Sequence, residues 1–327
     1  MSVRSALVVA RKDFEDAIRS RGVLFVSVLF VGLFVLGAYF FADAVSQQLQ
    51  NPPAGNAPAG NGSGPGGQPD VTSDSFLRTL STATTLLIPI VGVVASYAAI
   101  VGERASGTLK LLLALPHDRM EVVAGKVLGR GAVVCVPAVV GLLLGMLVFP
   151  LTAVTLEPGT YLLFTLLTAL FGVTFVTLAV GISAAVATER RAVIGSVGTY
   201  LFLVVFWNSL VDPTVGRLAD ALEWGTETSV EATLLLRLLN PLGAYKSLVS
   251  SLTTDSVALA RAGVIGQIHL STQGSRRAGL LQQIYAQQLS QGGVPFYLTD
   301  AAVLVYMLLW LVVPGVVGYL LFERSDL

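Results

Sequence analysis

The chain has 327 residues, of which 54% are hydrophobic and only 12% are charged. The 20 basic and 20 acidic residues cancel, and nucleic acid is not expected as a partner. The single cysteine, Cys135, excludes a disulfide framework and a cysteine-based metal site. This composition predicts one membrane domain over residues 1–327 rather than several soluble domains.

Six long segments of the chain contain no Asp, Glu, Lys, Arg or His. Because a helix rises 1.5 Å per residue, about 20 apolar residues cross a hydrocarbon core of about 30 Å. Lipid offers the backbone no hydrogen-bond partner, so segments of this kind must be helical. The sequence therefore predicts an all-α polytopic membrane protein with six transmembrane helices, at residues 23–42, 79–101, 132–155, 160–188, 192–211 and 301–322.

Residues 1–22 are predicted to form an amphipathic helix in the membrane interface. Apolar residues recur every three or four positions, and basic residues occupy much of the remaining helical wheel. Such a helix lies with its apolar face in the acyl chains and its basic groups near anionic headgroups. A short solvated lead-in to the first span is the alternative. The apolar positions are Val3, Leu7, Ala10, Phe14 and Ile18.

Basic residues favour one side of the predicted membrane domain. If the N-terminus lies in the cytoplasm, the cytoplasmic segments hold 13 of the 20 basic residues, although the outer segments are more than twice as long in total. This bias follows the positive-inside rule. Both termini are therefore predicted to be cytoplasmic, and the protein is expected in the cell membrane.

Two of the outer segments are long. Residues 43–78 contain a Gly-, Pro- and Asn-rich tract with little apolar surface, so this segment is predicted to be a flexible loop. Asn61-Gly62-Ser63 within it is an N-glycosylation triplet. Residues 212–300 carry leucines at helical spacing, which predicts short helices packed over the outer mouth of the bundle. A solvated loop is the alternative for residues 274–293.

Small and polar residues inside the spans are expected to serve helix packing. Threonines of the fourth span can hydrogen-bond to a neighbouring helix or to their own turn, and the alternative is that they line a path. Gly141 and Gly145 permit a close helix approach, either within the chain or in a dimer. The threonines are Thr165, Thr168, Thr174 and Thr177.

The cytoplasmic segment 102–130, after the second span, is the most specific part of the sequence. Charged residues begin it, Gly107 and Thr108 interrupt it, and a short apolar helix is predicted to follow and to end at Pro116, before a second charged turn. An apolar helix that does not cross the bilayer needs a protein surface or the lipid interface to cover it.

This segment resembles the pattern that follows the second span in ABC-2 type permeases, which reads E-x-x-x-G-T-L-E-x-L-L-x-x-P-x-x-R and then G-K. Lys110 departs from the pattern, where an acidic residue is usual, and so does the pair His117-Asp118. The turn at Glu189 and the residues from Leu239 to Tyr245 resemble the branch of nitrous-oxide-reductase maturation and sodium-efflux permeases. The matching positions are Glu103, Gly107, Thr108, Leu109, Leu112, Leu113, Pro116, Arg119, Gly125 and Lys126.

The resemblance implies that the chain is a permease subunit and not an enzyme. In ABC-2 permeases this segment supplies a coupling helix that docks into a groove of a separate ATPase subunit, which uses ATP with Mg²⁺. The resemblance also implies a second permease copy as partner, contact with the lipid bilayer, and transport in the export direction. The residues to which it assigns contact with the ATPase are Glu103, Arg104, Gly107, Thr108, Leu109, Leu112, Leu113, Pro116 and Arg119, with a second contact at Glu189, Arg190 and Arg191.

Other functions remain as alternatives. No phosphate-binding loop occurs, because Gly125-Lys126 continues with Val127 instead of Ser or Thr. The two histidines, His117 and His269, are too few for the metal site of a hydrolase. No cofactor, metal or catalytic residue is therefore expected in this chain. Ion-coupled secondary transporters place ionisable groups within their spans, which argues against that class, although backbone carbonyls near Pro89 and Pro314 could replace such groups. A membrane scaffold or receptor without transport is the other alternative. Only the ABC interpretation requires a partner ATPase.

Overall fold

The computed structural model describes residues 3–50, 71–108, 118–254, 256–266, 287 and 293–324. Within these residues the fold is almost entirely helical, and the bridge between Thr72 and Thr155 is isolated. Six stretches are long and apolar enough to cross a membrane: Arg21–Gln50, Ser73–Ala105, Arg119–Leu151, Pro158–Ala185, Glu189–Leu222 and Asp300–Glu323. The predicted all-α architecture with six candidate spans is therefore confirmed.

The helices follow one another with short breaks. Three short elements interrupt or join them: the 3₁₀ turns η1 (Phe149–Leu151) and η3 (Phe296–Leu298), and the π-helical turn η2 (Phe202–Phe206). The α-helices are α1 (Val3–Ile18), α2 (Arg21–Gln50), α3 (Ser73–Ser96), α4 (Val101–Ala105), α6 (Arg119–Met146), α7 (Pro158–Ala185), α8 (Glu189–Leu201), α9 (Trp207–Leu222), α10 (Thr226–Leu238), α11 (Pro241–Leu252), α12 (Val257–Gly266) and α14 (Asp300–Glu323).

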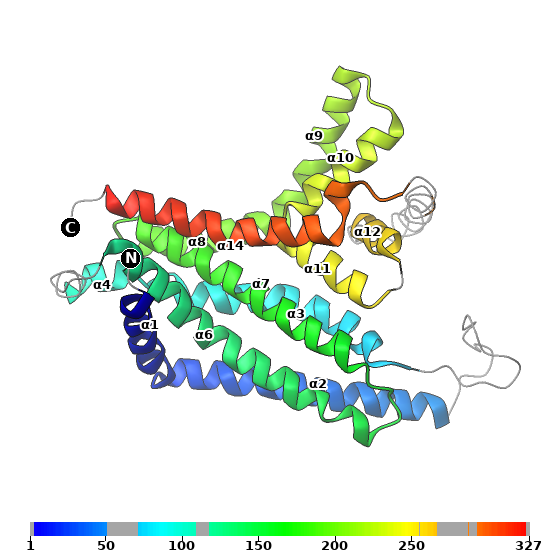
Figure 1. Cartoon of the computed structure of the whole chain (residues 1–327), viewed down its shortest axis with the longest axis horizontal. Helices are drawn as coiled ribbons and strands as arrows, with labels where there is room; N and C mark the ends of the chain where they lie inside the picture. Colours follow the sequence, from blue (N-terminus) through cyan, green and yellow to red (C-terminus); the bar gives the residue numbers. More distant parts are fainter. Residues whose placement is uncertain are drawn as a thin grey trace, which may run out of the picture.

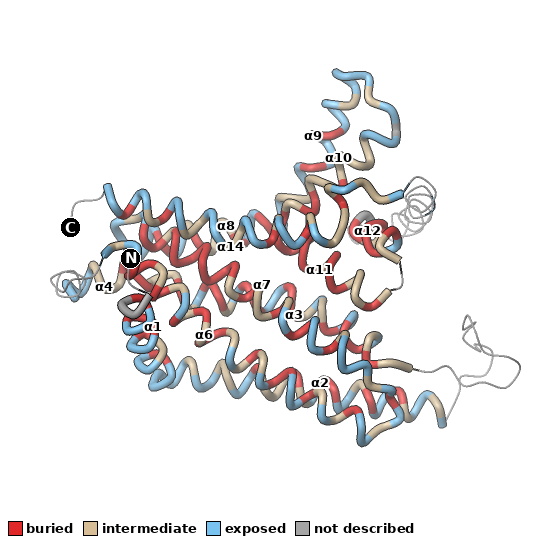
Figure 2. Tube along the Cα trace, in the orientation of Figure 1, coloured by how far each residue is buried: buried red, intermediate tan, exposed pale blue. Residues whose placement is uncertain are grey.

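Helix α7 is the centre of the bundle. It packs against α3, α6 and α14, and it is the most buried of the six spans. Figure 2 shows buried residues along most of its length. Helix α2 is among the three least buried spans, as expected for an apolar helix that faces lipid. Figure 1 shows both termini at the end of the bundle that carries α1 and α4, with α9, α10, α11 and α12 toward the opposite end.

Glycines permit the closest helix contacts. A Cβ atom on Gly181 of α7 would lie 2.2 Å from the carbonyl oxygen of Pro314 in α14, so only glycine fits there. A Cβ atom on Gly141 of α6 would lie 2.8 Å from the Phe34 ring of α2, and one on Gly145 would lie 3.0 Å from the Phe34 carbonyl oxygen. Of the two roles predicted for Gly141 and Gly145, the structure therefore shows the internal contact.

The threonines of the fourth span serve packing, as predicted. Thr165, Thr174 and Thr177 each donate from the hydroxyl to the carbonyl four residues earlier in α7. Thr168 instead pairs with the hydroxyl of Tyr245 on α11, at 2.8 Å. These hydroxyls thus have partners within the protein, which removes the cost of burying them unbonded.

Several helix boundaries differ from the predicted ones. Helix α2 extends to Gln50 and α3 begins at Ser73, so both ends of the segment 43–78 are helical, while residues 51–70 lie outside the described part of the chain. Helix α6 begins at Arg119, well before the predicted start at residue 132, and the predicted charged turn is its first part. The cause is the pairing of the charges on α6 with other helices, which allows charged turns to continue an apolar span. The span ends early because Pro150 lies within η1.

Short helices occupy much of the segment 212–300, as predicted, and one of them enters the bundle. Helix α11 packs against α3, α7 and α14. The ring of Tyr245 stacks on Phe171 of α7 with centroids 4.3 Å apart, and its hydroxyl lies 3.0 Å from that of Thr84 on α3. Most of the stretch 274–293, for which a loop was the alternative, lies outside the described residues.

Candidate coupling site

The second span is broken just before the predicted coupling residues. Helix α3 ends at Ser96, and the chain turns at Tyr97–Ile100 before α4 begins at Val101. The amides of Ile100 and Val101 both donate to the hydroxyl oxygen of Ser183 on α7, each at 3.1 Å. This buried hydroxyl satisfies two donors that the break would leave unpaired. The break therefore fixes α4, which carries Glu103 and Arg104, against α7.

Gly107 ends this short helix. Its φ of +76° lies in the region that residues with a side chain rarely adopt. The Thr108 hydroxyl donates to the carbonyl of Glu103 at 3.3 Å, which ties the turn back to α4. The predicted break at Gly107 and Thr108 is therefore a helix end that requires glycine.

Four charged side chains meet between α1, α4 and α6, and we call Asp13, Glu103, Lys126 and Arg130 the charge cluster. Lys126 Nζ lies 2.7 Å from Asp13 Oδ1 and 2.6 Å from Glu103 Oε1. Arg130 Nε lies 2.8 Å from Asp13 Oδ2. The side chains of Lys126 and Asp13 are only 4% and 5% exposed. Buried charges of this kind are tolerated only when paired, and here two cations match two anions.

Glycines bring α1 close enough to form the charge cluster. A Cβ atom on Gly125 would lie 2.7 Å from Val9 Cβ, and one on Gly129 would lie 2.8 Å from the Ala10 carbonyl oxygen. This close approach places the Asp13 carboxylate within ion-pair distance of Lys126, at 2.7 Å. Helix α1 is thus docked on α6 through the side that carries Asp13, Val9 and Ala10.

Beside the docked side, α1 also exposes apolar side chains. Leu7 is 54% exposed and Ile18 is 39% exposed, whereas Ala10, which was predicted to share their apolar face, is buried against α6. Helix α1 covers Val3–Ile18 of the predicted segment 1–22. Its position in the membrane interface stays a prediction.

Two arginines, one before and one after the segment 109–117 in the sequence, contact the ring of Phe322 on the last helix. The guanidinium carbons of Arg104 and Arg119 lie 5.6 and 5.1 Å from the centroid of the Phe322 ring. Arg119 also donates from Nη1 to the carbonyls of Phe322, at 2.5 Å, and Glu323, at 3.0 Å. Arg104 donates to the carbonyl of Val186 after α7, at 3.3 Å. Arg104 and Arg119 are therefore both anchored at Phe322, while residues 109–117 lie outside the described residues.

The second predicted contact lies beside the first. Glu189 Oε1 is 3.6 Å from the position that a Cβ atom on Gly102 would take, and α8 contacts α4. Thr188 caps α8 by accepting from the amide of Arg191 at 3.4 Å. Glu189, Arg190 and Arg191 are all exposed. The described residues of the two predicted contact regions thus lie side by side at the end of the bundle that carries the termini.

The structure brings together most of the predicted contact residues that it describes. Leu109, Leu112, Leu113 and Pro116 lie outside the described residues. Asp13 and Arg130 were not predicted as site residues, and Lys126 was noted only as part of the motif. The spacing of Gly125-Lys126 and Gly129-Arg130 was the available signal, because residues four apart share one helix face. Asp, Glu, His and Cys in the described residues form no group that could hold a metal ion.

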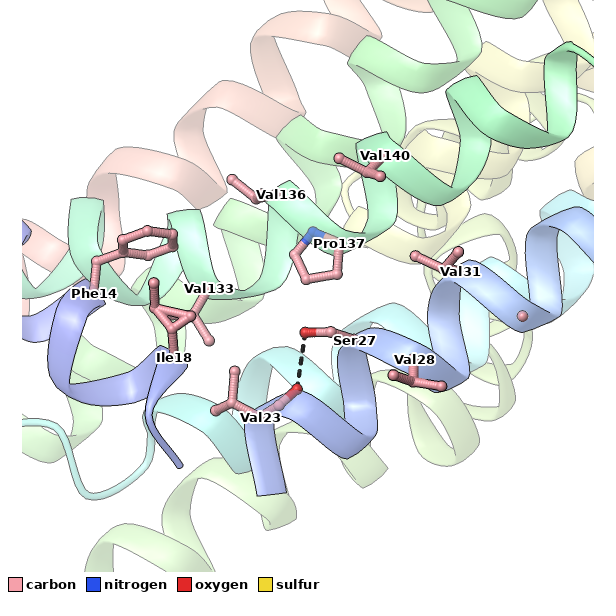
Figure 3. Close-up of a pocket in the computed structure, with 11 residues that line it drawn as sticks. Phe14, Ile18, Val23, Ser27, Val28, Val31, Val133, Val136, Pro137 and Val140 are labelled. Atoms are coloured by element: carbon pink, nitrogen blue, oxygen red, sulfur yellow. Dashed lines mark hydrogen bonds between the residues drawn. The ribbon is translucent and has the colours of Figure 1, made fainter. Parts of the chain in front are cut away.

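An apolar groove lies between α1, α2 and α6, with a volume of 520 Å³. Figure 3 shows Phe14 and Ile18 of α1 near Val133 of α6 at one end of this groove, and Pro137 of α6 across from Ser27 of α2. The Ser27 hydroxyl that reaches this groove donates to the Val23 carbonyl at 2.8 Å, so its hydrogen-bonding capacity is already used. The described residues that line the groove thus offer apolar contact and no free polar group for a ligand.

Comparison with known proteins gives a match over nearly the whole chain. The model of a family described as "ABC-2 family transporter protein" matches residues 7–327. A protein of Pseudomonas aeruginosa strain PAO1 named "probable ABC transporter permease protein NosY" is 28% identical over 248 residues, which cover 73% of this chain and 78% of that protein. A protein of the same name from Stutzerimonas stutzeri is 29% identical over 204 residues, which cover 61% of this chain and 66% of that protein.

Proposed function

The chain belongs to the ABC-2 family of transporter proteins, and from this premise we propose that it is a permease subunit driven by a separate ATPase subunit. The family match confirms the resemblance drawn from the segment 102–130, and the relatives named NosY match the suggested branch. A multi-pass membrane subunit of an ABC transporter accounts for the six apolar helices.

The observation that carries the proposal is the anchoring of α4 and of Arg119, which precede and follow the segment 109–117 in the sequence. The charge cluster joins α4 to α1 and α6, and the contacts of Arg104 and Arg119 with Phe322 join the same region to α14. A displacement of the segment 109–117 would therefore be passed to three parts of the bundle at once. Such a connection is what an ATPase needs in order to move membrane helices.

We assign the end of the bundle with α1, α4 and both termini to the cytoplasm of the cell membrane. The count of basic residues supports this orientation, because 13 of 20 fall on that side. The segment 212–300 then lies outside. A second permease copy and transport in the export direction complete the proposal, and both rest on the family resemblance.

The charge cluster does not favour the secondary-transporter alternative. Relay groups in ion-coupled transporters face a path or a cavity. Lys126 and Asp13 are instead buried, and each is engaged by two oppositely charged partners. This arrangement serves to join helices.

Co-purification with an ATPase tests the proposal. The tagged chain is purified from its native host in mild detergent, and the ATPase recovered with it is identified by mass spectrometry. A variant with Arg190→Glu and Arg191→Glu alters exposed residues of the predicted contact surface, and Arg217→Glu, exposed on α9 at the opposite end, is the matched control. We avoid Glu103 for this purpose because it pairs with Lys126.

We expect an ATPase with the unaltered chain and with Arg217→Glu, and several-fold less with the double variant, because reversed charges at an interface repel the partner. Recovery of no ATPase with the unaltered chain would refute the proposed function. Equal recovery with the double variant would refute the assigned contact surface.

A further inference from the structure

A second cavity lies where α11 enters the bundle, and it differs in character from the apolar groove. Its volume is 630 Å³, within the range of about 300–1,000 Å³ that suits a small organic ligand. Its walls come from α3, the π-helical turn η2, α9, α10, α11 and α12. Leu86, Leu203 and Val204 supply apolar surface, while Asn208 and Ser209 supply polar groups at one side.

The π-helical turn shapes one wall of this cavity. Turns of this kind are rare and frequently mark functional sites, and they bend helices. Figure 1 shows that α9 leaves the direction of α8 beyond this turn. The carbonyl of Leu203 within the turn accepts from the side-chain amide of Asn240 at 2.8 Å, and the same side chain accepts from the Leu242 amide at 3.0 Å. Asn240 thus fixes the wall and caps α11 at once.

The cavity carries two cations, and none of the described residues that line it is acidic. Arg237 is already engaged, because its Nη2 lies 2.7 Å from Asp212 Oδ1 and its Nη1 donates to the Val264 carbonyl at 3.2 Å. Lys246 has no ion-pair partner in the described part of the chain. Burial lowers the pKa of the Lys246 ammonium from its ordinary value. A half-buried ammonium without a counterion is costly, and an anionic ligand would remove that cost.

We propose that this cavity binds a ligand in which an anionic group is joined to an apolar body. The anion pairs with Lys246, and the apolar body lies against Leu203 and Val204. A sulfate, a phosphate or a carboxylate satisfies this chemistry, whether on a free amphiphile or on a lipid headgroup. The further statement that this ligand is the transported substrate rests on the proposed function. The binding itself does not depend on it.

Binding of octyl sulfate tests the proposal. The full chain is placed in phosphatidylcholine nanodiscs without ATP or an ATPase, and binding is measured by titration calorimetry against empty nanodiscs. Octyltrimethylammonium has the same tail with the opposite charge. The variants are Lys246→Gln and the charge-conserving Lys246→Arg, with Arg217→Gln as an exposed control on α9 that does not line the cavity.

We expect saturable binding of one octyl sulfate per chain and none of octyltrimethylammonium. Lys246→Gln should weaken binding about tenfold or more, because a hydrogen bond to a charged group is lost, while Lys246→Arg and Arg217→Gln should stay within about threefold. No saturable binding, equal binding of the two amphiphiles, or equal affinity in Lys246→Gln would each overturn the proposal.

Nanodiscs that contain phosphatidylglycerol distinguish the two sources of the anion. If these discs lower the apparent affinity for octyl sulfate in the unaltered chain but not in Lys246→Gln, a lipid headgroup occupies the site. If the affinity of the unaltered chain is the same in both kinds of disc, the ligand is a free amphiphile. Both results support the anionic site. Because no ATPase is present, failure of binding and failure of ATPase recovery are separate outcomes.

Discussion

Replacing Lys126 with Met removes the central cation of the charge cluster while keeping a side chain of similar length. The substitution leaves Asp13 and Glu103 without the ammonium that lies 2.7 and 2.6 Å from their oxygens. We expect this change to destabilise the docking of α1 and α4 on α6, because both helices meet α6 through this group.

The size of the expected destabilisation depends on the charge partners and the solvent contact that Asp13 and Glu103 keep when Lys126 is replaced. Removing one partner of a buried ion pair costs about 3–5 kcal/mol. Asp13 keeps Arg130 at 2.8 Å, and Glu103 is 22% exposed, so water can solvate part of its charge. We therefore expect a loss near the lower end, about 3 kcal/mol in the free energy of unfolding. Adding Glu103→Gln should restore part of this loss, because it removes one of the uncompensated charges.

The assay is unfolding in dodecyl maltoside micelles with increasing sodium dodecyl sulfate, followed by tryptophan fluorescence. Arg11→Gln is the matched control, because Arg11 and Glu15 form an ion pair on α1 with the same 2.7 Å separation. That pair is exposed, at 82% and 47%, so its loss should leave stability unchanged within error. Equal effects of Lys126→Met and Arg11→Gln would refute the reasoning, since burial would then not decide the strength of these pairs.

Two further substitutions test the packing that positions the sites, in the same unfolding assay. Gly125→Ala should lower stability by about 1–3 kcal/mol, because the new Cβ would lie 2.7 Å from Val9 Cβ, whereas Gly32→Ala, with nothing within 4 Å, should have little effect. Tyr245→Phe should lower the free energy of unfolding by about 1–2 kcal/mol, because it removes the hydrogen bonds to Thr84 and Thr168 while keeping the ring stack on Phe171. Unchanged stability would show that these hydrogen bonds contribute nothing.

The spans were predictable because an unpaired charge is expensive in lipid, so charge-free runs mark the membrane core. Helix ends were not predictable in the same way. Helix α6 continues through Lys126 and Arg130 because Asp13 and Glu103, which are distant in sequence, neutralise them. Such pairing depends on tertiary packing and leaves no trace in the local composition.

The role of Asp13 could have been suspected from α1 itself. Asp13 shares a helix face with Ala6, Ala10 and Ala17, a stripe of small residues that lets α1 approach another helix. The glycines at 125 and 129 supply the complementary stripe on α6. What the sequence did not indicate is that these two stripes face each other.

The π-helical turn at Phe202–Phe206 and the cavity beside it had no local signal. The turn is stabilised by Asn240, from a helix that follows much later in the chain, and Asn240 was noted only as part of a family resemblance. The cavity exists because helices from distant parts of the sequence meet around Lys246.

The central claim is that α4 and the segment after it lie on the cytoplasmic side, where an ATPase can reach them. Ser106 is exposed at the end of α4, and Thr228 is exposed on α10 at the opposite end of the molecule. Each is replaced by Cys in a Cys135→Ala background, and intact cells are treated with a membrane-impermeant maleimide before and after permeabilisation. We predict that Ser106→Cys reacts only after permeabilisation and that Thr228→Cys reacts in intact cells. Reaction of Ser106→Cys in intact cells would contradict the account.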